Sequence, residues 1–305
     1  MTNSQHINEL MKNCRLCPRM CGADRTKGYG FCLMPDKITA ALASVHMYEE
    51  PPISGQNGSG TVFFSGCNLK CVFCQNHHIS QEGFGTFLTE EQLAKIFINQ
   101  QNKGVHNINI VSGAHFAPQI AEAIKMAKKN GLKIPVVYNS SGYELVSTLK
   151  ILNGLVDVYL PDIKYFSPEL SEKYSMAKDY FSVASKAVIE MYSQAGPPVF
   201  DDNGIMLKGV IIRHLVLPSC RKDSFKILDF IKEAFGDNVY VSILNQYTPM
   251  YKALHIKELN RRVTTFEYQS VIDHFFEIGL KNGYMQGKES AKSQYTPVFD
   301  LSGLK

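Results

Sequence analysis

Three cysteines between Cys67 and Cys74 have the residue type and the spacing to bind an iron–sulfur cluster. Cys67, Cys71 and Cys74 are separated by three and then by two residues. A fully ligated [4Fe–4S] cluster needs four cysteines, so three thiolates leave one iron open to a small molecule. Alternatives are a zinc site, although closed zinc sites use four ligands, and three thiols that meet only as small buried side chains. The spacing favours a catalytic cluster over one that only stores electrons.

The surroundings of these cysteines resemble the signature of the radical S-adenosylmethionine (radical SAM) enzymes. The aromatic Phe73 directly precedes the last cysteine, and the apolar run 61–66 directly precedes the first. That run predicts a β-strand, and loops at the C-terminal ends of barrel strands are where α/β barrels place their active sites. The resemblance implies that Cys67, Cys71 and Cys74 bind the cluster and that S-adenosylmethionine (SAM) binds at its open iron.

A second group of cysteines lies near the start of the chain. Cys14, Cys17, Cys21 and Cys32 form the pattern Cys-x2-Cys-x3-Cys-x10-Cys, with glycines between them that allow tight turns. Four thiolates are a complete ligand set, so we predict a closed metal site, either structural zinc or a second iron–sulfur cluster that relays electrons. Two disulfides or unligated thiols are the alternatives. Cys220 stands alone and is predicted to be a free thiol.

Composition narrows the class of protein. The 305 residues carry 32 Lys and Arg against 28 Asp and Glu, a net charge of +4, which gives no reason to expect nucleic-acid or membrane partners. The first twelve residues contain no apolar signal region, and no window is apolar enough for a membrane span. We therefore expect a cytoplasmic protein, whose clustered cysteines bind metal more readily than they form disulfides. An open cluster would also make it oxygen-labile.

The elements that must position these residues alternate along the chain. Strands are predicted at 61–66, 107–111, 135–139, 156–164, 210–217 and 239–244, and a hairpin at 199–207. Helices are predicted at 89–103, 117–130, 143–152, 179–194, 222–235 and 264–281, with a shorter one opening at 167–168. Six βα units predict a parallel sheet that is too short to close. The expected fold class is α/β: a partial (β/α)6 open TIM-like barrel at 59–305, behind a small Cys-rich metal-binding segment at 1–58.

Polar residues follow the second and third predicted strands. Radical SAM enzymes commonly carry a Gly-Gly-Glu-like stretch after the second strand, which holds the amine of SAM. Here Ser112 and Gly113 stand at that point without an acid, so only backbone carbonyls would contact the amine. After the third strand, Asn139 and Ser141 are candidates to hydrogen-bond the ribose. In both places an ordinary loop is the alternative.

Charged residues interrupt the fourth and fifth strands. Asp162 and Lys164 are two positions apart, so both side chains can face the barrel interior. Buried charges are costly unless they are paired or functional, and a structural salt bridge is the alternative to a functional pair. Arg213 lies within an apolar strand and therefore needs an anionic partner, such as a carboxylate of SAM or of the substrate. His214 alternates to the other face and is predicted to serve packing.

Taken together, residues 10–300 resemble the pyruvate formate-lyase activating enzymes, in particular the branch called PflX. The resemblance rests on the three cluster cysteines, on Asp162-x-Lys164 and on Arg213 before a strand that ends in Pro218. It implies that Asp162 and Lys164 work near the substrate or a monovalent cation, and that Arg213 contacts SAM or the substrate loop. Tyr247 or Gln246, after the sixth strand, stands where the activases carry a substrate-side histidine.

The resemblance also implies a reaction. A reductant such as flavodoxin or ferredoxin would reduce the [4Fe–4S] cluster, and SAM would be cleaved to methionine and a 5′-deoxyadenosyl radical that abstracts a hydrogen atom. The predicted target is a glycine of a glycyl-radical-enzyme-like protein partner. One alternative is a radical SAM enzyme acting on a small molecule or peptide. The other is a non-catalytic iron–sulfur or zinc scaffold or electron carrier.

Overall fold

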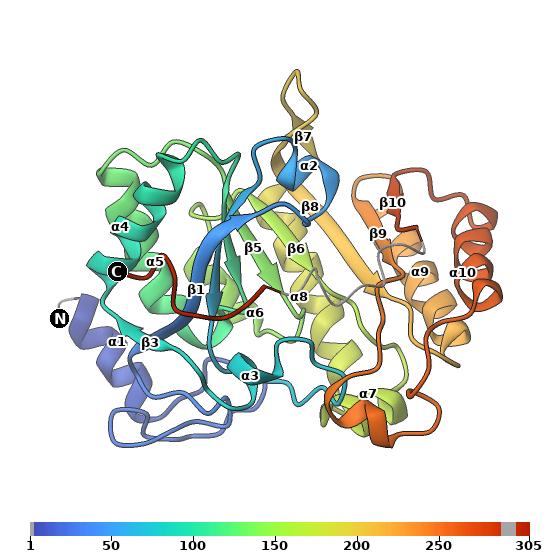
Figure 1. Cartoon of the computed structure of the whole chain (residues 1–305), viewed down its shortest axis with the longest axis horizontal. Coiled ribbons are helices and arrows are strands. Elements are labelled where there is room, and N and C mark those ends of the chain that lie inside the picture. Colours follow the sequence, from blue (N-terminus) through green and yellow to red (C-terminus); the bar gives the residue numbers. More distant parts are fainter. Residues whose placement is uncertain (1–2, 288–296) are drawn as a thin grey trace.

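A ten-stranded sheet with helices packed against it organises the computed structural model, which describes residues 3–287 and 297–305 (Figure 1). The strands are β1 (Ile38–His46), β2 (Ser59–Phe64), β3 (Thr86–Leu88), β4 (Ile108–Val111), β5 (Val136–Ser140), β6 (Val158–Pro161), β7 (Val199–Phe200), β8 (Met206–Leu215), β9 (Tyr240–Leu244) and β10 (Gly283–Met285). Their order is β10-β9-β8-β6-β5-β4-β2-β1-β3, with β7 paired to β8.

The predicted fold class is confirmed, because the six predicted strands (β2, β4, β5, β6, β8 and β9) form a parallel sheet that does not close. The number of parallel strands was underestimated, since β10 pairs parallel to β9 as a seventh. On the other side of the sheet, β1 pairs antiparallel to β2 and β3 pairs antiparallel to β1. The predicted hairpin is also present, with Val199 opposite Lys208.

The helices of the described chain are α1 (Asn3–Lys12), α2 (Pro51–Ser54), α3 (His77–Ser80), α4 (Glu90–Gln101), α5 (Ala117–Lys129), α6 (Val146–Leu149), α7 (Pro168–Ser175), α8 (Tyr180–Ala195), α9 (Arg221–Phe235) and α10 (Thr265–Glu277), with short 3₁₀ turns at Ala114–Phe116, Lys150–Leu152 and Tyr251–His255. The long helices α4, α5, α8, α9 and α10 pack into the core on the face of the sheet that is turned away from the barrel interior. The Thr89 hydroxyl accepts from the backbone N–H of Gln92, whose side-chain oxygen accepts from the Thr89 N–H, so the predicted capping box opens α4. The Ser167 hydroxyl caps α7 with one bond, which it accepts from the backbone N–H of Leu170.

The two faces of each strand have different roles, because successive side chains alternate. In β5, Val136 and Tyr138 belong to the large core shared with the helices, whereas Val137 belongs to a separate apolar cluster with Val158 of β6. Asn139, two positions after Val137, is therefore on the interior face. The predicted strand 156–164 is shorter than expected, because β6 ends at Pro161, but the same alternation continues past it and directs Asp162 and Lys164, and Arg213 of β8, toward the interior.

The N-terminal residues are joined to the barrel rather than separate from it in space. β1 completes the sheet beside β2, and the C-terminal residues lie along β1, where the Leu301 N–H donates to the Ala41 carbonyl at 3.0 Å. The domain boundary at residue 58 stays a prediction, and its two segments include residues 1–2 and 288–296, which lie outside the described residues.

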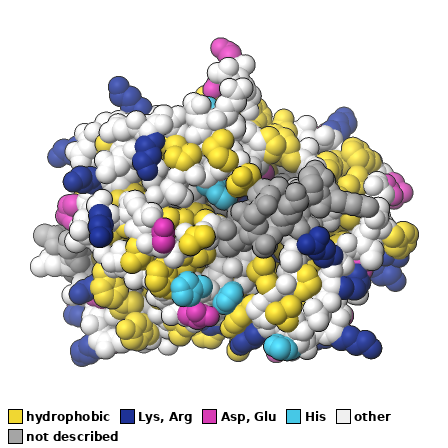
Figure 2. All heavy atoms as spheres, viewed as in Figure 1, with side chains coloured by type: hydrophobic (Ala, Val, Ile, Leu, Met, Phe, Trp, Pro, Cys, Tyr) yellow, Lys and Arg dark blue, Asp and Glu magenta, His cyan; other side chains and the backbone are white. Residues whose placement is uncertain are grey.

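The surface agrees with the mild net charge. On the face seen in Figure 2, Lys and Arg side chains lie mainly at the periphery, and hydrophobic and histidine side chains gather nearer the centre. Within the described part of the chain, no helix has the length and apolar character needed to cross a bilayer.

Candidate active site

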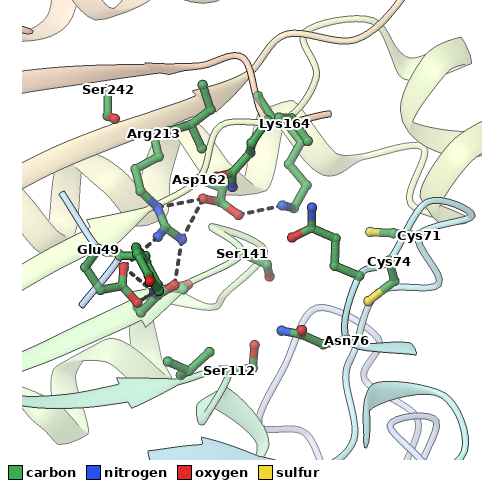
Figure 3. A pocket seen from close by; sticks show the side chains of 18 of the residues that line it. Glu49, Cys71, Cys74, Asn76, Ser112, Ser141, Asp162, Lys164, Arg213 and Ser242 are labelled. Carbon is green, nitrogen blue, oxygen red and sulfur yellow. Dashed lines mark hydrogen bonds and ion pairs between the residues drawn. The ribbon is translucent and has the colours of Figure 1, made fainter. Parts of the chain in front are cut away.

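A large cavity lies inside the partial barrel, at the C-terminal ends of its strands, with a volume of about 540 Å³. Cys67, Cys71 and Cys74 all line it. The same cavity is lined by residues from β2, β4, β5, β8 and β9, by Asp162 and Lys164 just after β6, and by the segment after β1. The three predicted cluster ligands are thus brought together with the polar ends of the strands. Figure 3 shows Cys71 and Cys74 on one side of the cavity and Asp162 and Arg213 on the other.

Backbone hydrogen bonds hold the cysteine loop in place. The N–H of Cys67 donates to the Cys32 carbonyl at 3.3 Å, and the N–H of Val72 donates to the Tyr174 carbonyl at 2.9 Å. The Val72 carbonyl in turn accepts from Ala253 at 2.8 Å. Leu69 is buried between the cysteines and packs with the tyrosines of the second core cluster. The loop is therefore anchored on three sides before any cofactor binds.

The chemistry of this loop fits a [4Fe–4S] cluster. Burial raises the pKa of Cys67 to about 12 and that of Cys74 to about 11, so the bare thiols hold their protons and a cationic metal centre would be needed to favour the thiolates. The Lys70 ammonium is buried beside Cys67 without a hydrogen-bond partner among the described residues, and an anionic thiolate cluster would neutralise it.

The cysteines do not converge as ligands of one ion would. Among the described residues, no group of three or more His, Cys, Asp and Glu side chains is arranged to hold a metal ion. A cubane places its irons at separate corners, so its three cysteines need not meet at one point.

Asp162, Lys164 and Arg213 meet on the interior side of the sheet, as the strand period predicts. Lys164 Nζ lies 2.5 Å from Asp162 Oδ2, and Arg213 Nε and Nη2 lie 3.0 and 2.9 Å from Asp162 Oδ1. Burial tends to raise the pKa of Asp162, but the two cations outweigh it and hold that pKa below its usual value. The anionic partner expected for Arg213 is therefore present within the protein itself.

Two further acids in this network, Glu49 and Glu50, were not predicted from the sequence. Both follow β1. Glu49 Oε2 lies 3.4 Å from Arg213 Nη1, on the side of Arg213 away from Asp162 (Figure 3), and Glu50 Oε1 lies 4.0 Å from Arg213 Nε. Burial raises the pKa of both carboxyls, that of Glu50 to about 6. The signal available in the sequence was the acidic pair before Pro51, but without β1 in the predicted fold nothing directed it inward.

Of the two predicted residues after β4, Ser112 faces the cavity and Gly113 faces the helix layer. Ser112 lines the cavity and has a positive φ of 61°, a strained conformation for a residue other than glycine, and its N–H donates to the Asn139 carbonyl at 3.0 Å. Gly113 faces the opposite way, because a Cβ there would overlap Ile120 and Ile110 under α5. Close packing of strand and helix thus explains this glycine, and only its backbone is available to a ligand.

Asn139 and Ser141, after β5, both line the cavity. The Asn139 side-chain oxygen accepts from Arg213 Nη2 at 2.6 Å, and its amide nitrogen lies 3.4 Å from both carboxylate oxygens of Glu49. Asn139 is therefore part of the charged network. The Ser141 carbonyl accepts from the Tyr180 hydroxyl at 2.7 Å, and its side chain has the space to meet a ligand (Figure 3).

Tyr247 lines the cavity with its ring rather than with its hydroxyl. The hydroxyl donates to the Leu259 carbonyl at 2.8 Å, and the ring packs edge-on against Phe73 with centroids 5.9 Å apart. Its position supports the cysteine loop. Gln75 and Asn76, which follow the last cysteine, also line the cavity and were not among the predicted site residues.

The four N-terminal cysteines lie close to the cysteine loop. Cys14, Cys17 and Cys32 are buried and Cys21 is exposed. The buried guanidinium of Arg25 donates to the carbonyls of Pro35 and His115 and, at 3.6 Å, to Cys14 Sγ, which fixes the segment against the barrel. All eight cysteines, Cys220 among them, are free thiols, so the disulfide alternative is not realised.

The remaining histidine prediction concerns the outer face of β8. His214 is buried there, away from the cavity, and its ring nitrogens contact the Ile163 carbonyl and the Ser224 hydroxyl, each at 2.8 Å. Burial lowers its pKa, which is typical of a neutral packing histidine.

Comparison with known proteins identifies similar chains. Residues 61–216, half of the chain, match the family described as the radical SAM superfamily. The uncharacterized protein MJ0674 of Methanocaldococcus jannaschii is 33% identical over 276 residues, which are 87% of this chain and 74% of that protein.

Among solved structures, Streptococcus suis SuiB bound to the precursor peptide SuiA superposes with a TM-score of 0.50 at 14% identity, over 72% of this chain and 46% of SuiB. A domain of pyruvate-formate lyase-activating enzyme from Bacteroides vulgatus gives a TM-score of 0.41 at 12% identity, over 56% and 92% of the two chains. This chain thus spans less than half the length of SuiB, and at 14% identity the likeness to SuiB concerns the fold alone.

Proposed function

The chain belongs to the radical SAM superfamily, and we propose that it cleaves SAM reductively at a [4Fe–4S] cluster held by Cys67, Cys71 and Cys74. Enzymes of this superfamily use SAM and such a cluster, which together supply a one-electron cleavage of the sulfonium and a radical that removes a hydrogen atom. The observation that carries the proposal is that three thiols line the same cavity as a buried network of charged side chains.

Residues of the chain would bind and orient the cofactors. Lys164 pairs with the Asp162 carboxylate at 2.5 Å. Burial alone would lower the pKa of Lys164, but the contact with Asp162 outweighs burial and raises that pKa above its usual value. Its charge therefore persists at neutral pH and favours anionic groups at the mouth of the cluster site. The hydroxyls of Ser112 and Ser141 and the amide of Asn139 are the candidate partners of the SAM ribose and methionine moieties.

We propose two candidate targets for the radical. The resemblance to the activating enzymes favours a glycine in a protein partner, with flavodoxin or ferredoxin as reductant and a cytoplasmic location. The enclosed, charged interior around Arg213 favours a second candidate, a small molecule or peptide whose polar group enters the cavity. Adding a candidate glycyl radical enzyme and recording its radical signal at low temperature separates the two.

The N-terminal cysteines are proposed to hold zinc or a second iron–sulfur cluster. Burial and the neighbouring thiols of Cys32 and Cys14 raise the pKa of Cys17 to about 11. A bound metal would lower that pKa, because it stabilises the thiolate. Because the Cys32 carbonyl accepts from the backbone of Cys67, a metal here would adjoin the cysteine loop. Metal analysis of Cys17→Ala against the wild type tests the site: equal zinc and equal iron in both would contradict it.

The radical reaction is tested by anaerobic reconstitution, reduction, and electron paramagnetic resonance with and without SAM, together with an assay for 5′-deoxyadenosine. We expect SAM to change the cluster signal and 5′-deoxyadenosine to form. Cys67→Ala should abolish both, whereas Cys220→Ala, which removes a buried thiol outside the cavity, should leave both intact. An unchanged signal with intact SAM in the wild type would favour the scaffold alternative instead.

A further inference from the structure

The end of the cavity farthest from the cysteines is acidic. Glu49 and Glu50 both line it, and their side chains are only 8% and 5% exposed. Figure 3 shows Glu49 on the far side of Arg213 from Cys71 and Cys74. A molecule that touches the acidic end can therefore extend past Arg213 toward the cysteine loop. One end of the cavity thus presents carboxylates to a ligand, and the other end presents cysteine thiols.

The buried charges of the described residues do not balance in this region. Within residues 3–287 and 297–305, Arg213 and Lys164 supply two positive charges here, and Asp162, Glu49 and Glu50 supply three negative charges when ionised. Asp162 takes the short contacts to both cations, at 2.5 to 3.0 Å, and the two glutamates are left with longer contacts to Arg213, at 3.4 and 4.0 Å. One added positive charge at the glutamate end would complete the balance.

One carboxylate oxygen at the acidic end also lacks a partner. Glu50 lines the cavity, and its Oε2 is buried and accepts no hydrogen bond from the described residues. Buried polar atoms are nearly always paired, so this oxygen is suited to a polar ligand. Asn109, an interior residue of β4 with no exposed surface, lies beside Glu49 outside the cavity lining and lowers the pKa of that carboxyl.

We propose that the acidic end, formed by Glu49 and Glu50, binds a cationic group of the substrate, a primary ammonium or a guanidinium. This rests on the proposed radical SAM function and names the class of molecule on which it acts. Carboxylates only accept hydrogen bonds, whereas ammonium and guanidinium groups only donate them, and each carries the missing charge. A free amine and a basic side chain of a peptide both supply such a cation.

The experiment measures binding to the anaerobically reconstituted full chain with SAM present, by titration calorimetry. The probes are 1,5-diaminopentane and a short peptide with one arginine, each matched with a neutral analogue, 1,5-pentanediol and the same peptide with citrulline. We expect at least one cationic probe to bind tenfold or more tightly than its neutral analogue. Preference for the diamine or for the peptide identifies the source of the cation.

Variants then locate the binding. Glu50→Gln keeps the shape of the side chain and removes the excess charge, and we expect it to lower the affinity for the cationic probe at least tenfold. Glu49→Gln provides a second test if Glu50→Gln unfolds at a lower temperature than the wild type. Glu258→Gln, a surface acid paired with Lys173 outside the cavity, should leave binding unchanged. Equal binding of cationic and neutral probes, or undiminished binding to both cavity variants, overturns the inference.

The outcome is independent of the radical reaction. Cation binding without 5′-deoxyadenosine in the wild type would contradict the proposed function and leave the cation site standing. Formation of 5′-deoxyadenosine without selective cation binding would contradict only the site.

Discussion

Replacing Asp162 by Asn tests whether the interior charges form one interdependent network. The Asp162 carboxylate contacts Arg213 and Lys164, and the three side chains are only 13% to 17% exposed. Asn keeps the shape but removes the charge, so two buried cations lose their closest anion. Breaking a buried ion pair by removing one partner costs about 3–5 kcal/mol. We expect the free energy of unfolding to fall by about 3 kcal/mol, the lower end of that range, because Glu49 still faces Arg213 and the Asn oxygen still accepts a hydrogen bond.

The assay is urea unfolding of the wild type and the variant, with the slope and the midpoint fitted separately. Asp237→Asn is the matched control, because Asp237 also bridges two cations, Lys232 at 3.4 Å and Lys281 at 3.7 Å, but is 37% exposed. Exposed ion pairs contribute about 0–1 kcal/mol, so this variant should change little. If Asp162→Asn is no more destabilising than Asp237→Asn, the interior charges are not an interdependent network and the argument fails.

Much of the fold was readable because strong local signals agreed with one another. The capping box at Thr89 and the Ser167-Pro168 start each opened a helix where predicted. The strand period correctly placed Asp162 and Arg213 on the interior face and His214 on the outer one. These predictions succeed because a buried strand fixes the direction of every second side chain, whatever lies at the far end of the sheet.

The strands that were missed carry weak signals. The sequence of β1, Ile-Thr-Ala-Ala-Leu-Ala-Ser-Val-His, is rich in alanine, a helix former, and its pairing with β2 depends on tertiary contacts. Strand β10 has only three residues, and it forms by pairing with the free edge of β9. Missing β1 had a functional consequence, because the segment after it carries Glu49 and Glu50 into the cavity. Local patterns did not indicate that these acids would reach Arg213, far along the chain.

Two further predictions concern buried features that support the site. Burial raises the pKa of Glu144 to about 7, so the folded state disfavours the ionised carboxylate. The free energy of unfolding should therefore fall by about 3 kcal/mol as pH rises from about 4.5 to 7. Glu144→Gln should remove that fall, and a variant whose unfolding free energy changes with pH in parallel with the wild type would contradict the prediction. Gly142 and Gly204 share positive φ values of 75° and 77°, but a Cβ at 142 overlaps the Asp162 carbonyl, whereas the space at 204 is open. Gly204→Ala should therefore cost about 1 kcal/mol for the backbone alone, and Gly142→Ala about 1–3 kcal/mol more, because it must also displace the strand that carries Asp162. Since both substitutions strain the backbone alike, equal losses in urea unfolding would show that the carbonyl moves aside freely and that Asp162 is not held rigidly by its neighbours.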